Sequence, residues 1–116
     1  MEAINYSAAL LSVKRYKEAK AMLRKMIPVA QRILGTDDEN TLTTRWNYAI
    51  TLYQDSTATL DDLREAVTTL EAMERFVPRV FGGTHPIAVG IERSLRNAQT
   101  VLSAREAGED VVWVKP

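Results

Sequence analysis

The chain contains two copies of one pattern, and this internal repeat restricts its fold more than any other feature. Asn5–Leu11 (NYSAALL) returns as Asn47–Tyr53 (NYAITLY), 42 residues later, and Tyr16–Ala19 (YKEA) returns as Leu63–Ala66 (LREA), 47 residues later. The longer spacing then relates Leu23 to Leu70, Met26 to Met73, Arg32 to Arg79 and Gly35 to Gly82. The change in spacing places a five-residue insertion between Tyr53 and Leu63. A period of this size indicates helical units that bury their apolar faces by stacking on one another.

Bulk composition excludes several classes of protein. The 116 residues are enough for one domain with a modest core, and 15 basic residues balance 15 acidic ones. A neutral chain lacks the positive surplus that nucleic acids and anionic membranes attract, so we expect neither as a partner. There is no cysteine, no apolar run long enough to span a bilayer and no signal-peptide pattern at the start. A cytoplasmic location is therefore the expectation.

Apolar residues at helical spacing predict five helices, over about residues 2–13, 16–34, 40–53, 60–80 and 85–107. The second helix is predicted to bury a stripe that runs to its end: Ala19, Leu23, Met26, Ile27, Ala30, Ile33 and Leu34. Pro28 should bend this helix, and Gly35 should end it.

Capping residues mark where the later helices begin. The third helix starts after Asp38 or Asn40, the fourth after Thr59 with Asp62 as a reciprocal cap, and the fifth at Pro86 after Thr84 or His85. After Gly108 the tail contains Val111–Val114, a β-prone apolar patch without a partner strand. This tail is disordered, docked on the last helix or paired with another molecule.

Short motifs recur at matching places in the two copies. They are Asn47-Tyr48-Ala49, Tyr16-Lys17-Glu18-Ala19, Arg32-Ile33-Leu34-Gly35 with Thr41-Leu42, and Arg79-Val80-Phe81-Gly82 with His85-Pro86. Together they resemble the tetratricopeptide repeat (TPR) of the kinesin-light-chain type, whose long period matches the 42-residue spacing. The resemblance covers about residues 3–107.

The resemblance implies an all-α, right-handed superhelix of antiparallel helical hairpins. The repeat domain would span residues 1–107, with hairpins over about 2–35 and 40–81 and a C-terminal capping helix over about 85–107, followed by the tail 108–116. The sequence departs from the family at Asp38-Glu39, where the family has His-Pro, and at Leu63, where it has Tyr. Arg96 stands where Ala49 predicts a small residue, and a shift of two restores Ala98. This loss of register favours a capping helix. Because about three repeats are usually needed, the chain is expected to be a fragment or the end of a longer array.

In this family the first helix of each hairpin lines a concave face. The resemblance therefore places these residues on or near that face: Asn5, Thr43, Trp46, Asn47, Ile50, Tyr53, Arg93 and Asn97. An asparagine amide both donates and accepts, so it can hold the backbone of an extended peptide. Trp46 is either an aromatic anchor in the groove or a packing residue between hairpins.

The implied function is a noncatalytic protein-binding scaffold that holds a peptide or helix of a partner protein. The alternative is a structural segment that self-associates through exposed repeat ends or its tail, as a homo-oligomer. No enzyme, cofactor or metal site is expected, because His85 fits a helix cap and Asp37, Asp38 and Glu39 fit the start of a helix.

Two other groups of residues receive a structural interpretation. The basic cluster Lys14, Arg15, Lys17, Lys20, Arg24 and Lys25 is assigned to a solvated outer face. Met22, Met26 and Met73 are assigned to core filling.

Overall fold

The computed structural model describes residues 15–55 and 57–108, and in this part the chain is all-helical. The helices are α2 (Tyr16–Leu34), α3 (Glu39–Gln54), α4 (Leu60–Phe81) and α5 (Pro86–Glu106), and no strand occurs among them. The predicted helix over residues 2–13, with Asn5, and the Val111–Val114 patch lie outside the described residues. The all-α prediction is confirmed for the part that the structure describes.

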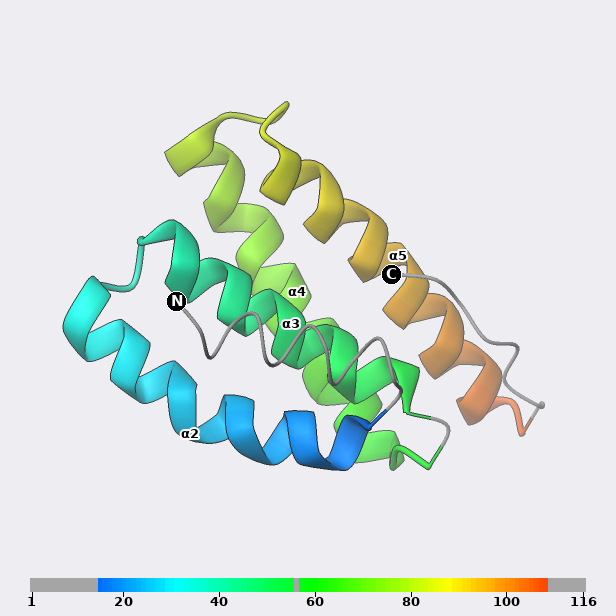
Figure 1. Ribbon diagram of the computed structural model, residues 1–116. Helices are drawn as coiled ribbons and strands as arrows, with labels where there is room; N and C mark the ends of the chain where they lie inside the picture. Colours follow the sequence, from blue (N-terminus) through cyan, green and yellow to red (C-terminus); the bar gives the residue numbers. More distant parts are fainter. Residues whose placement is uncertain (1–14, 56, 109–116) are drawn as a thin grey trace.

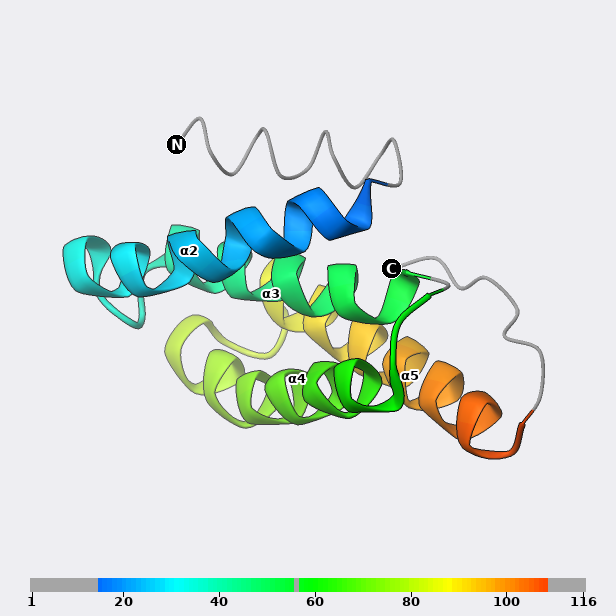
Figure 2. The same cartoon turned by 90° about the horizontal axis from the view of Figure 1, so that it is seen from below.

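Successive helices reverse direction, so α3 and α5 run the same way (Figure 1). Helix α3 is the centre of the arrangement, because it packs against α2, α4 and α5, while α5 also packs along α4. Figure 2 shows α3 between α2 on one side and α4 on the other. The helices thus form successive layers rather than a ring around one axis.

Local sequence signals place the helix ends as predicted. Asp38 accepts a hydrogen bond from the backbone N–H of Asn40 at the start of α3. Thr59 and Asp62 form a complete capping box at the start of α4, in which each side chain accepts from the other's backbone N–H. Gly35 and Gly82 follow α2 and α4 with φ of 94° and 90°, a conformation that side-chain-bearing residues rarely adopt. Figure 1 shows α2 bent near its middle, in keeping with Pro28 inside it.

The predicted apolar stripes form one continuous core. Leu42, Ala49 and Leu52 of α3 meet Leu63, Leu70 and Met73 of α4 and Ile91, Leu95 and Ala98 of α5 in a single buried cluster. Ala98 is fully buried whereas Arg96 is exposed, which agrees with the two-residue shift inferred for the last helix.

One part of the stripe prediction is wrong. Ile33 is 70% exposed and Leu34 is 36% exposed, although both were predicted to be buried with Leu23 and Ala30. Burial along α2 ends at Ala30, whose carbonyl accepts a hydrogen bond from the Thr41 hydroxyl of α3. The last turn of α2 therefore projects past the helix that covers the rest of its stripe.

No described helix is long and apolar enough to span a membrane.

Candidate interface between α3 and α5

A shallow apolar depression lies between α3 and α5. Its lining consists of Trp46, Ile50, Pro86, Val89, Gly90 and Arg93, and its volume is about 530 Å³. We call this site the α3–α5 groove. Three of the predicted binding residues, Trp46, Ile50 and Arg93, come together here, from the first helix of one predicted hairpin and from the predicted capping helix.

Trp46 lies across this groove and also holds its two walls together. Its indole Nε1 donates a hydrogen bond to the Ser94 hydroxyl of α5 at 2.9 Å. The ring also lies directly over Gly90: a Cβ added there would stand 2.3 Å from the Cη2 atom of Trp46. Real Cβ contacts do not come so close, so only glycine lets α5 approach the ring. Trp46 is thus half-buried packing that also lines the groove, and the two interpretations of it are compatible.

Local chemistry fixes the start of α5 beside this ring. The Nδ1 atom of His85 accepts a hydrogen bond from the N–H of Ile87 at 3.1 Å, and Pro86 occupies the first helical turn. The imidazole packs against Phe81, with ring centroids 4.9 Å apart. His85 is therefore occupied as a helix cap, the role expected from the sequence.

The predicted residues of α3 other than Trp46 are half-buried or buried. Thr43 and Asn47 are half-buried, and the Thr43 hydroxyl donates to the backbone carbonyl of Glu39 at 2.8 Å. Ile50 is only 6% exposed and Tyr53 only 2%. Tyr53 therefore belongs to the core and does not offer its side chain to a partner.

Tyr53 points at α5. Burial raises the pKa of its hydroxyl, and the neighbouring Ser94 and Asn97 oppose that shift. The Tyr53 hydroxyl makes no hydrogen bond of regular geometry. Asn97 is half-buried beside it, whereas Arg93 is exposed at the rim of the groove. These placements divide the predicted set into exposed, half-buried and buried members.

Sequence reasoning missed Pro86, Val89, Gly90 and Ser94 as neighbours of Trp46. Gly90 carried a usable signal, because a glycine inside a helical pattern weakens the helix and often marks a close approach. The partner in that approach could not be read from the sequence, since Trp46 is 44 positions away from Gly90.

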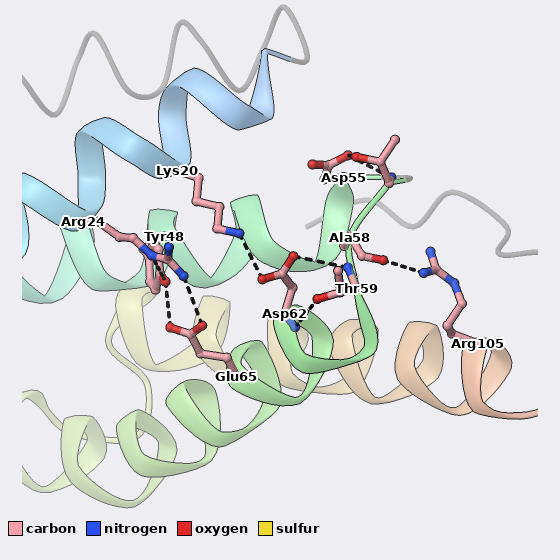
Figure 3. A network of polar contacts seen from close by, with 10 residues as sticks. Lys20, Arg24, Tyr48, Asp55, Ala58, Thr59, Asp62, Glu65 and Arg105 are labelled. Atoms are coloured by element: carbon pink, nitrogen blue, oxygen red, sulfur yellow. Dashed lines mark hydrogen bonds and ion pairs between the residues drawn. The ribbon is translucent and has the colours of Figure 1, made fainter.

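A polar network fastens α2 to α3 and α4 (Figure 3). The Tyr48 hydroxyl accepts from Arg24 Nε at 2.9 Å and donates to Glu65 Oε2 at 2.6 Å. A second link joins Lys20 Nζ to Asp62 Oδ1 at 2.9 Å. The sequence interpretation assigned Lys20 and Arg24 to a solvated face. Arg24 is exposed, as that assignment expected, whereas Lys20 is half-buried, and both side chains form ion pairs with acids of α4.

The Tyr48 hydroxyl and the Arg24 guanidinium shift each other's pKa. Burial raises the pKa of Tyr48, and its hydrogen bond to Glu65 adds to that shift while Arg24 opposes it. The hydrogen bond to Tyr48 raises the pKa of Arg24. Both shifts favour the charged form of Arg24 and the neutral form of Tyr48, which are the forms that these groups already take near neutral pH.

Asp62 gives a testable pH dependence. Burial acts to raise the pKa of its carboxyl, but the Lys20 ammonium and the Thr59 N–H outweigh burial and hold the pKa below its usual value. When folding lowers the pKa of a carboxyl, the ionised carboxylate stabilises the folded protein. This stabilisation is complete at pH values above the unfolded-state pKa and is lost as the pH falls through the folded-state pKa.

We expect Asp62→Asn to lower the free energy of unfolding near neutral pH by about 1 kcal/mol or less, because the pair is partly solvated. Asparagine can still accept from the Thr59 N–H, so the helix cap survives. Urea unfolding at about pH 7 and about pH 3 measures both proteins. The difference between them should shrink at the acidic pH, and a difference that does not change with pH would contradict the assignment.

Among the described residues, no group of three or more His, Cys, Asp or Glu side chains could hold a metal ion. Comparison with protein-family models, with curated proteins and with solved structures gives no match to this chain.

Proposed function

We propose that this chain is a noncatalytic protein-binding module of the TPR type, which holds a peptide or a helix of a partner protein in the α3–α5 groove. One observation carries the proposal: residues predicted to line a concave face, Trp46, Ile50 and Arg93, meet in one apolar depression. Its volume of about 530 Å³ suits several side chains of a bound segment.

The chemistry of the groove supports the same function. Trp46, Ile50, Pro86 and Val89 offer apolar contact, and the Arg93 guanidinium offers donors at the rim. Asn47 and Thr43 lie on the same helix as Trp46 and are half-buried, so their polar groups are not fully enclosed. Aromatic residues and arginine are enriched at interface hot spots, which makes Trp46 and Arg93 the main anchors of the proposed interface.

The outer surface of α5 supports the role of a capping helix. Arg96, Gln99, Thr100 and Ser103 are exposed along it beside the half-buried Ala104, and Arg96 pairs with Glu92 within the helix. A helix that had to receive another hairpin would present an apolar face there. The polar surface of α5 also disfavours the alternative of head-to-tail self-association through this end. The tail, the other proposed route, lies outside the described residues.

Trp46 is a poor choice for testing the groove, because its removal also loosens α5. Val89 and Arg93 of α5 are exposed residues of the groove. Val80 and Arg79 of α4 are their matched controls, because Val80 and Val89 are both 44% exposed and Arg79 is exposed like Arg93. Substitution at these positions leaves the core intact, so a change in binding is not a consequence of unfolding.

A displayed peptide library selected on the wild-type chain supplies the ligand. We expect Val89→Gln and Arg93→Glu to weaken the selected peptides about tenfold or more, while Val80→Gln and Arg79→Glu bind normally. Fluorescence anisotropy measures affinity, and circular dichroism checks that each variant is folded. The proposal fails if selection yields no binder, or if the groove variants and the controls bind alike.

A further inference from the structure

Helix α2 carries an apolar seam that the described helices leave open. Met22, Met26, Val29 and Ile33 follow one another at spacings of four, three and four residues, so they share one side of the helix. Met22 and Met26 are half-buried, Val29 is 42% exposed and Ile33 is 70% exposed. We call these four residues the α2 seam. Along one edge it merges with the buried residues Ala19, Leu23 and Ala30.

The other edge of the α2 seam is basic. Lys25 and Arg32 stand seven residues apart on that edge, and both are exposed. The remaining cations of the helix are used differently, because Lys20 and Arg24 reach to Asp62 and Glu65 of α4. Within the part of the chain that the structure describes, Lys25 and Arg32 form no ion pair of this kind. An apolar strip beside two available cations is the pattern of a helix-docking surface.

We propose that the α2 seam is a second protein-docking surface, separate from the α3–α5 groove, and that its occupant is an amphipathic helix of a partner with acidic residues beside its apolar stripe. The partner's apolar residues would pack on Val29 and Ile33, and its carboxylates would face Lys25 and Arg32. The seam runs over 12 residues, so a partner helix of about three to four turns would cover it.

Charge argues against a second copy of this chain as the occupant. Two copies whose α2 helices meet antiparallel through the α2 seam, by a two-fold axis, would bring the Lys25 and Arg32 edges of both molecules together. A parallel pair would set each basic edge beside the Ala19, Leu23 and Ala30 edge of the other copy, which offers no carboxylate. Like charges placed across an interface oppose association. An acidic helix would instead be attracted to the edge that carries Lys25 and Arg32. This charge complementarity favours an acidic partner helix over self-association.

The test uses a pair of labelled synthetic peptides of about four helical turns, with leucines at the same spacing and either glutamates or lysines on the flanks. We expect the glutamate peptide to bind the full chain and the lysine peptide to bind at least tenfold more weakly. Ile33→Gln should reduce binding about tenfold, whereas Val80→Gln and the groove variant Val89→Gln should leave it unchanged. The double variant with Lys25→Glu and Arg32→Glu should prefer the lysine peptide instead.

Several results would overturn this inference. The wild-type chain could bind neither peptide or bind both equally, or Ile33→Gln could behave like Val80→Gln. Sedimentation could show a wild-type dimer that Ile33→Gln dissociates, in which case a second copy is the occupant. Peptides that depend on Val89 and Arg93 should be indifferent to Ile33→Gln, so failure at one surface is distinguishable from failure at the other.

Discussion

Leu52→Ala should lower the free energy of unfolding by about 2–5 kcal/mol. Leu52 is 1% exposed in α3, the helix that packs against all three other described helices. Alanine leaves a cavity that rigid helix packing fills only in part, so the lost contacts add to the lost transfer free energy. A domain of this size has a total stability of about 5–15 kcal/mol, which makes the loss a large fraction of the whole.

Urea denaturation followed by circular dichroism measures this effect, and Leu34→Ala is its matched control. Leu34 ends α2 and is 36% exposed, so the same chemical change there should alter stability by about 1 kcal/mol or less. If both variants lose the same stability, the burial difference between Leu52 and Leu34 is not real. The melting temperature should fall by several degrees for each kcal/mol lost, about 10 °C or more for Leu52→Ala.

Gly90→Ala should destabilise the protein by about 1–2 kcal/mol, although alanine favours a helix over glycine by about 1 kcal/mol. The added Cβ would stand 2.3 Å and 2.4 Å from two ring carbons of Trp46. The ring must move, and its hydrogen bond to Ser94 keeps it from moving freely. Overpacking of this kind costs about 1–3 kcal/mol, and the lost hydrogen bond adds to that penalty.

The sign of this effect should reverse when the ring is absent. In a Trp46→Leu background the clash disappears, so Gly90→Ala should stabilise α5 by up to about 1 kcal/mol through helix propensity alone. The free energies of unfolding of the four proteins form a double-mutant cycle with a large coupling energy. Additive effects would show that Trp46 does not lie on Gly90. Peptide binding by Gly90→Ala also reports whether the position of Trp46 shapes the α3–α5 groove.

Local features of the helices were readable from the sequence. The Thr59–Asp62 capping box, the Gly35 terminator and the start of α5 at Pro86 each depend on residues within a few positions of one another. The stripes of α4 and α5 likewise follow from spacing within one helix, and Leu63, Leu70, Ile91 and Leu95 are buried as predicted. Such short-range rules act before any neighbour is chosen, so a single sequence is enough to apply them.

Ile33 shows where that reasoning stops. Its spacing places it on the apolar side of α2, but periodicity says which side a residue takes and not how far the covering helix extends. Lys20 shows the opposite case, since a lysine expected to face solvent lies 2.9 Å from Asp62 of another helix. In both cases the outcome depends on the length and placement of a neighbour.

The sequence alone determined that residues 16–106 form amphipathic helices with defined ends, because hydrogen bonding, capping and apolar spacing are properties of neighbouring positions. Tertiary structure alone decided that Trp46 lies on Gly90, that Tyr48 joins Arg24 to Glu65, and that Ile33 remains exposed. Those pairings depend on the angle and offset at which whole helices pack. They are set by the summed fit of many side chains, which no local pattern encodes.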